Sequence, residues 1–359
     1  MNKVALVTDL KVVDSPQAGL GVARCLKETG FDIIGVDDTP FINAGSSLFK
    51  KAYCWEEIRT LNFDSLIRKI IDIQKIYGLD FIFPCYDETI ILFSFLKDKL
   101  DYLGVQLIAP DINVLKEIRK SNLSKFIINN DRYQTPATKI VFSIEGAIKY
   151  AESIEYPVVC KGLTKGAYVC DDKNSLIENV NKISKIWNNG EISCLIQKYI
   201  EGSYENCIVA LRENEIVGYV EMTKIGLDQN GATWFGKIKK TTNLLKFAEE
   251  VTHKFAFGTS IIEIETINNN GKYNIYEINP RSPAWIYAAC QLGLNMPALV
   301  TKSSGNSGVR FIKEEGYFGR ETKEFIRKDI DNYGDNLNFY SKGAAYKRKN
   351  MSYPSDLLL

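Results

Sequence analysis

Two strongly alternating segments in the C-terminal third of the chain constrain its fold most. Residues 261–267 read Ile-Ile-Glu-Ile-Glu-Thr-Ile, and residues 273–281 read Tyr-Asn-Ile-Tyr-Glu-Ile-Asn-Pro-Arg. Strict alternation of apolar and polar residues is typical of a half-buried strand. The segment between them, Asn268-Asn-Asn-Gly-Lys272, supplies turn-forming residues. We therefore expect a long antiparallel hairpin with one face in the core.

This hairpin brings acidic side chains together. With a register symmetric about residue 270, Glu263 lies directly opposite Glu277, and Glu265 faces Ile275. Directly opposed side chains lie about 4.5–5.5 Å apart at Cβ, where like charges destabilise a sheet. A divalent cation would offset this repulsion, and Asn279 offers a third oxygen on the same face. The alternative is a polar strand edge that faces solvent and holds nothing.

A donor set without His or Cys selects Mg²⁺ or Mn²⁺. Such sites commonly hold the metal together with substrate phosphates. The sequence therefore predicts Glu263, Glu277 and Asn279 as metal ligands, and it ranks Glu265 below Glu263.

The first 112 residues show a different pattern. Apolar segments alternate with helical patterns, which favours β-α-β units and a parallel sheet. The expected strands are 4–7, 32–36, 81–84 and 105–109, and the expected helices are 18–30, 63–77 and 88–101. The sequence Ala18-Gly-Leu-Gly matches only part of a dinucleotide fingerprint, so a nicotinamide oxidoreductase is a weak alternative.

Beyond residue 112, helices and strands are mixed without a repeat. Helices are expected at 113–130, 144–153, 174–188 and 242–256, and strands at 139–142, 156–161, 194–200, 205–211 and 215–223. The chain as a whole reads as an α/β protein, with an N-terminal parallel-sheet, Rossmann-like domain ahead of a second, α+β part.

Composition excludes several classes of function. Lys and Arg number 45 against 44 Asp and Glu, so the formal charge of +1 indicates neither nucleic-acid binding nor attraction to anionic membranes. The single histidine, His253, excludes most catalytic zinc sites. The eight cysteines show no C-x-x-C spacing, which is typical of reduced thiols in a cytosolic protein. With no signal peptide or spanning segment in the sequence, we expect a cytoplasmic protein.

The sequence Glu277-Ile-Asn-Pro-Arg281 resembles the E-x-N-P-R signature of the ATP-grasp superfamily. The type it is most similar to is the carboxylate-amine ligase type of carbamoyl-phosphate synthase and biotin carboxylase. In that superfamily the first metal carboxylate lies about a dozen residues upstream, and Glu263 is assigned to that place. The resemblance implies ATP and Mg²⁺ (or Mn²⁺) as cofactors. It also implies that Arg281 stabilises an acyl phosphate.

Further motifs follow in the order that the superfamily has. Lys125 in Ser121-Asn-Leu-Ser-Lys125 and Lys161 in Pro157-Val-Val-Cys-Lys161 match the two lysines that neutralise the triphosphate. By the same analogy Lys224 faces the site and contacts phosphate.

Residues 196–202, Ile-Gln-Lys-Tyr-Ile-Glu-Gly, resemble the hinge strand that holds adenine. There the resemblance implies backbone contacts from Gln197 and Ile200, with Lys198 near the base. Glu205 matches the acid that binds the ribose hydroxyls. The loop after Lys161 is shorter than is usual in the superfamily.

The resemblance implies four parts along the chain. These are a pre-ATP-grasp domain over 1–112, a small ATP-grasp lobe over 113–200, a large lobe over 201–310, and a tail over 311–359 that packs on the large lobe. It implies a ligase that joins a small-molecule or peptide carboxylate to an amine, or less favourably a thiol, and that forms ADP. Kinase and bicarbonate-activating chemistry stay open, as does a degenerate nucleotide-binding sensor or scaffold. A homodimer is the family-level expectation.

Overall fold

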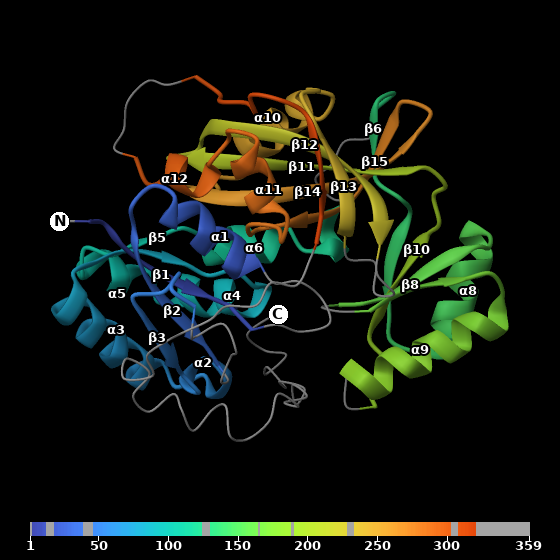
Figure 1. The fold of residues 1–359 in the computed structure, drawn as a ribbon. Coiled ribbons are helices and arrows are strands. Elements are labelled where there is room, and N and C mark those ends of the chain that lie inside the picture. The colour runs from blue at the N-terminus through green and yellow to red at the C-terminus, as the bar shows by residue number, and fades with distance from the viewer. Residues whose placement is uncertain are drawn as a thin grey trace.

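The computed structural model describes residues 2–11, 18–38, 46–123, 130–163, 166–187, 190–227, 233–302 and 308–320. These residues form a mixed α/β fold built on three sheets (Figure 1). The predicted α/β class is confirmed, and the N-terminal sheet is parallel as expected. Among the described helices, none has both the length and the apolar character needed to cross a bilayer.

The N-terminal sheet is parallel and has the strand order β3-β2-β1-β4-β5. Its strands are β1 (Val4–Thr8), β2 (Asp32–Asp37), β3 (Lys51–Cys54), β4 (Leu79–Phe83) and β5 (Gln106–Leu107). Its helices are α1 (Ala18–Lys27), α2 (Glu57–Thr60), α3 (Phe63–Tyr77), α4 (Asp87–Phe95) and α5 (Lys97–Tyr102). All five residues of β1 are buried, as expected for a parallel strand covered on both faces. The helix predicted over 88–101 is divided into α4 and α5 at Leu96.

The second sheet has the order β7-β10-β8-β9 and is antiparallel. It contains β7 (Thr138–Val141), β8 (Val158–Gly162), β9 (Ala167–Cys170) and β10 (Cys194–Lys198), together with α8 (Ile144–Ile154) and α9 (Lys173–Trp187). The two helices pack on this sheet around a small core of their own (Figure 1). Ser143 begins α8 because its side chain accepts a hydrogen bond from the Gly146 amide.

The largest sheet has the order β16-β13-β12-β11-β14-β15-β6. Its strands are β6 (Tyr133–Gln134), β11 (Ser203–Arg212), β12 (Glu215–Leu227), β13 (Thr233–Lys239), β14 (Ser260–Asn269), β15 (Lys272–Asn279) and β16 (Gly316–Gly319). The remaining helices are α6 (Ile112–Glu117), the 3₁₀ helix η2 (Lys120–Asn122), α10 (Leu245–Lys254), α11 (Ile286–Gln291) and α12 (Met296–Val300).

Two predicted segments extend past the described residues. The helix expected over 113–130 is present as α6 and η2 up to residue 122, and residues 124–129 lie outside the described part. Of the tail expected over 311–359, residues 316–319 form β16 on the edge of the large sheet, and residues 321–359 lie outside it.

Helix α1 joins the N-terminal sheet to the helices that follow the hairpin. A Cβ atom on Gly21 would lie 2.8 Å from Ile286 Cγ2, so the two helices approach closely. Asn295 donates a hydrogen bond of 2.7 Å to the Cys25 carbonyl, and Glu28 accepts from Gln291 at 2.6 Å. These contacts fix the parallel sheet against the large sheet.

The β14–β15 hairpin exists, but its register differs from the predicted one. Asn270 and Gly271 both have positive φ, 51° and 88°, and form a two-residue turn between Asn269 and Lys272. Such a turn suits the twist of an antiparallel hairpin. A β-bulge then shifts the pairing by one more residue. As a result Glu265 pairs with Glu277 and Glu263 pairs with Asn279, so the predicted pairing of Glu263 with Glu277 is wrong.

Candidate active site

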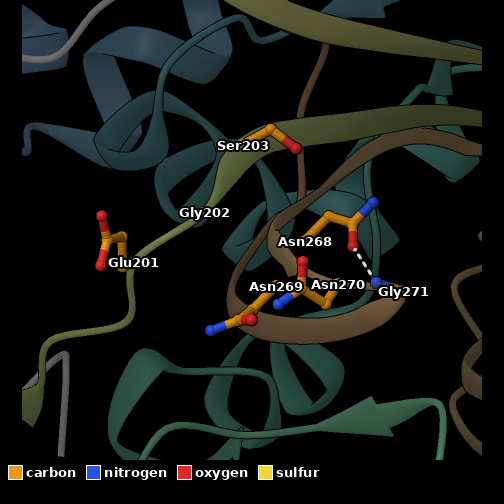
Figure 2. A pocket seen from close by; sticks show the side chains of 7 residues that line it. All are labelled: Glu201, Gly202, Ser203, Asn268, Asn269, Asn270 and Gly271. Carbon is orange, nitrogen blue, oxygen red and sulfur yellow. Dashed lines mark hydrogen bonds between the residues drawn. The ribbon is translucent and has the colours of Figure 1, made fainter.

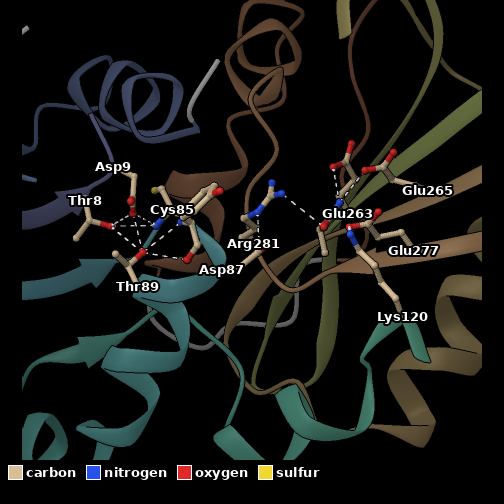
Figure 3. Close-up of polar contacts among 12 residues, drawn as sticks. Thr8, Asp9, Cys85, Asp87, Thr89, Lys120, Glu263, Glu265, Glu277 and Arg281 are labelled. Atoms are coloured by element: carbon tan, nitrogen blue, oxygen red, sulfur yellow. Dashed lines mark hydrogen bonds and ion pairs between the residues drawn. The ribbon is translucent and has the colours of Figure 1, made fainter. Parts of the chain in front are cut away.

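One face of the hairpin carries a group of polar side chains. Glu263 and Glu265 lie two positions apart on β14, so they point to the same side of the sheet, and Glu277 and Asn279 do the same on β15. The Asn279 amide nitrogen donates to Glu265 at 2.8 Å and to Glu263 at 3.2 Å. Figure 3 shows the three carboxylates gathered at this place.

The opposed carboxylates Glu265 and Glu277 are each paired with a lysine. Lys224 Nζ lies 2.6 Å from Glu265 Oε2, and Lys120 Nζ lies 2.9 Å from Glu277 Oε1. Lys224 comes from β12, which β11 separates from β14, whereas Lys120 is the first residue of η2. The repulsion expected between the two acids is thus offset by two cations of the chain itself.

Glu263 has a different environment. It is 5% exposed, and its oxygens accept hydrogen bonds from Asn206 Nδ2 (2.8 Å), Trp285 Nε1 (2.8 Å) and Asn279. Burial, followed by the charge of Glu265, raises the pKa of Glu263. Its hydrogen-bonding capacity is therefore used within the protein.

Glu265 stays ionised in the same surroundings. Burial alone would raise its pKa, but Lys224 and the Tyr276 hydroxyl outweigh burial and lower the pKa to about 2. The ranking of Glu263 above Glu265 depended on the predicted pairing with Glu277, and in the structure Glu265 makes that pairing.

The donor set fits an oxygen-preferring divalent cation. Glu265 and Glu277 present two opposed carboxylates. In the described part of the chain, no group of three or more His, Cys, Asp or Glu side chains is arranged to hold a metal on its own. Two carboxylates completed by phosphate oxygens and water are the common arrangement for Mg²⁺. The amide nitrogen of Asn279 faces the glutamates, and its oxygen lies 3.5 Å from Arg281.

Three lysines surround the carboxylates. Lys161, at the predicted place on β8, donates to Gln197 Oε1 at 2.7 Å, and its Nζ lies 4.5 Å from the centre of the Tyr276 ring. Burial lowers the pKa of Lys161 to about 8, with Glu277 raising it and Lys120 lowering it further. Lys125 lies outside the described residues.

Lys120 is a site residue that the sequence did not identify. Burial lowers the pKa of its ammonium, but the nearby charge of Glu277 outweighs burial and raises the pKa overall. The ammonium is therefore protonated. The only local signal was a second lysine within the same predicted helical segment, five positions before Lys125.

Arg281 follows the strand as predicted and links two sheets. Its Nε lies 2.7 Å from Oδ1 of Asp87, the first residue of α4. The turn before α4 is held in turn by the end of β1, because Thr89 donates to Asp9 at 2.6 Å and the Cys85 amide donates to Thr8 at 3.1 Å. Figure 3 shows this series of contacts running from the parallel sheet to the carboxylates.

The predicted adenine-binding residues lie at several places. Gln197 is buried beside Lys161, and Lys198 donates to the carbonyls of Ile154 and Glu155 at the end of α8, at 2.7 and 3.0 Å. Ile200 lines an open pocket of about 400 Å³ next to the tip of the β14–β15 hairpin. Gln197 and Lys198 thus lie on β10, and Ile200 lies in the segment that follows it.

Glu205 is separated from the carboxylates. Its neighbour Asn206 pairs with Glu265 and points to the carboxylate face, so Glu205 points to the opposite face of the sheet. There it accepts from Lys239 at 3.1 Å and from Asn268 at 3.3 Å. Its predicted contact with ribose is not supported by this placement.

A larger pocket lies at the hairpin tip, away from the carboxylates. It has a volume of about 610 Å³ and is lined by residues 201–203 and 268–271 (Figure 2). Gly202 approaches the Asn268 backbone so closely that a Cβ atom would lie 2.3 Å from its carbonyl oxygen. The segment after β10 is thereby held against the tip of the hairpin.

No model of a known protein family matches the sequence. Solved structures do match the fold. One is the biotin carboxylase domain of 2-oxoglutarate carboxylase from Hydrogenobacter thermophilus, in complex with MgADP, ADP and bicarbonate. It is 17% identical, covers 88% of this chain and 73% of its own, and has a TM-score of 0.63.

Two other matching structures are synthetases or ligases. The L-amino acid ligase from Bacillus licheniformis is 13% identical, covers 83% of this chain and 73% of its own, and has a TM-score of 0.61. N5-carboxyaminoimidazole synthetase from Staphylococcus aureus with ADP is 12% identical, covers 88% and 82%, and has a TM-score of 0.64. These are ATP-grasp proteins, and the chain has the ATP-grasp fold.

Proposed function

We propose that the chain is an ATP-dependent ligase that activates a carboxylate as an acyl phosphate and joins it to an amine. The observation that carries this proposal is the opposed pair Glu265 and Glu277, flanked by Lys120, Lys161 and Lys224 on one face of the hairpin. Two anionic groups among three partly buried cations are the arrangement that a magnesium–triphosphate complex requires.

Glu265 and Glu277 would hold the metal, with Asn279 orienting Glu265. Bound Mg²⁺ would supply charge neutralisation at the phosphate oxygens. The three lysines bind the triphosphate, and Lys120 and Lys224 release the carboxylates that they contact in the absence of nucleotide. Glu263 has a structural role beside the site, because three hydrogen-bond donors fix its position.

The reaction needs no nucleophile from the protein. A carboxylate oxygen of the substrate attacks the γ-phosphorus, and ADP leaves with the bond electrons. The amine nitrogen then attacks the acyl carbon, loses a proton and expels phosphate. Arg281, held by Asp87 next to the carboxylates, is placed to bind the anionic acyl phosphate.

The matched structures guide the choice of substrates. One bears the name of an L-amino acid ligase, and another was solved with MgADP and bicarbonate. We therefore place amino acids first among the acids and amines to test, and bicarbonate next.

The proposal is tested by ADP release from Mg-ATP in the presence of pooled acids and amines. We expect substrate-dependent ADP formation that is lost in Glu277→Gln and kept in Glu249→Gln, a control on the exposed face of α10. Unchanged ADP formation in Glu277→Gln would show that the site is wrong. Tight ATP binding without turnover in any pool would favour the nucleotide-binding sensor instead.

A further inference from the structure

The β-bulge in the hairpin turns one aromatic side chain toward the carboxylates. The pairing passes from Glu265–Glu277 to Thr266–Ile275, which leaves Tyr276 as the extra residue without a partner across the strands. In a regular strand, Tyr276 would point to the face opposite Glu277. A bulge re-aims a side chain in this way, and such bulges are common next to active sites.

Tyr276 contacts one carboxylate and two lysines of the site. Its hydroxyl donates to Glu265 Oε2 at 2.6 Å, the same oxygen that Lys224 contacts, and lies 3.5 Å from Lys224 Nζ. Lys161 Nζ lies over the face of its ring, 4.5 Å from the ring centroid. The side chain is 9% exposed, so these contacts are shielded from water.

The two ends of this side chain act on different charges. The hydroxyl restrains Glu265, because a buried carboxylate that receives a hydrogen bond keeps one orientation. The ring face attracts the Lys161 ammonium, because the π-system is negative there. A phenylalanine would keep the second contact and lose the first.

We propose that Tyr276 is a positioning residue that prepares Glu265 for the divalent cation through its hydroxyl and Lys161 for the triphosphate through its ring. This inference rests on the proposed function only for the identity of the ligands, ATP and Mg²⁺. Tyr276 does not touch the reacting atoms, and it acts through Glu265 and Lys161.

The test separates the two contacts in the full-length protein by measuring ATP binding calorimetrically, with EDTA and with a titration of Mg²⁺. In Tyr276→Phe, the Mg²⁺ concentration that gives half of the maximal increase in ATP affinity should rise about 10–100-fold. This is the usual cost of losing a hydrogen-bond partner of a metal ligand. ATP affinity in EDTA should stay within about twofold of the unchanged protein, because the cation–π contact remains.

A trifluorinated phenylalanine at position 276 tests the ring. It keeps the shape of phenylalanine but removes the negative face, so ATP affinity in EDTA should fall several-fold below that of Tyr276→Phe. Tyr273→Phe is the matched control, because Tyr273 lies on the same strand but packs against Tyr133. It should change neither quantity.

Two results would overturn the inference. One is a Tyr276→Phe protein that requires no more Mg²⁺ than the unchanged protein. The other is an equal loss of ATP affinity with and without Mg²⁺, which would indicate a general packing role. Failure of the ligase proposal would give a different result. Mg²⁺-dependent ATP binding would then be seen without ADP release from any acid and amine pool.

Discussion

Glu265 lies directly opposite Glu277 across the β14–β15 hairpin, while Glu263, two residues earlier on the same strand, lies opposite Asn279. The first pair faces two lysines, and the second is enclosed by amide and indole donors. Position on the hairpin thus divides three acidic residues into two that are paired with lysines and one that accepts hydrogen bonds from neutral donors.

Substitution of the two glutamates on β14 should have contrasting effects. Glu265→Gln should lower kcat/KM for ADP release at least about 100-fold, since a bound metal contributes several kcal/mol of charge stabilisation. Glu263→Gln should instead lower the free energy of unfolding by about 1–3 kcal/mol, because donors in the core lose an acceptor. Urea denaturation and ADP release measure the two effects, and the reverse pattern would contradict this division.

ATP binding should weaken as the pH rises through the pKa of Lys161. That pKa is about 8, so the ammonium is present below pH 8 and is lost above it. Lys120, Lys224, Glu265 and Glu277 are the charged groups that face it. The apparent affinity for ATP should therefore fall above pH 8 by up to about tenfold per pH unit.

Calorimetric titrations from about one pH unit below that value to about one above measure this dependence. Lys161→Arg should abolish the decline, because a guanidinium stays charged throughout the range. A decline of equal slope in Lys161→Arg would assign the effect to another group.

Lys120 should be needed for ATP binding. Lys120→Met should weaken binding about 10–100-fold, since a hydrogen bond to a charged group contributes about 1.5–3 kcal/mol. Lys116→Met is the control, because Lys116 is exposed on α6. Equal affinities for the two variants would remove Lys120 from the site.

Asp87 should affect turnover more than nucleotide binding. Asp87→Ala removes the partner of Arg281 at 2.7 Å, and a displacement of about 1 Å in a positioned group can cost about 100-fold in rate. We expect kcat for ADP release to fall at least about tenfold with little change in KM for ATP. Asp87→Asn, which can still accept from Nε, should recover part of the rate.

The control for Asp87 is Asp98→Ala on α5, where the side chain is exposed. If Asp87→Ala raised KM for ATP and left kcat unchanged, Arg281 would be acting on the nucleotide and not on the substrate.

The sequence predicted which strands carry the site better than it predicted the register between them. Alternation and turn residues predicted the hairpin, and the signature at Glu277 predicted the fold. The predicted pairing of Glu263 with Glu277 failed because it depended on register. The two-residue turn and the bulge at Tyr276 each shift the pairing, and nothing in the local sequence marks a bulge.

The contacts of other residues could not be predicted, because the partners are far apart in the sequence or because the face of the strand was not considered. Asp87 meets Arg281 across 194 positions, and no periodicity connects them. Lys120 and Lys125 lie in one predicted helix, so only the packing of η2 against β15 shows that Lys120 reaches Glu277. Glu205 could have been questioned from the sequence, because alternation puts it and Asn206 on opposite faces of one strand.

The packing of α1 on α11 and α12 has a consequence for synthesis on the ribosome. Gly21 and Cys25 are buried against residues 286–295, which are translated more than 250 positions later. This face of α1 therefore stays uncovered on the growing chain until α11 and α12 have emerged. Contacts of such long sequence separation slow folding and expose partly folded chains to aggregation. The N-terminal sheet and its helices are accordingly complete in sequence long before the surface that buries α1 has been made.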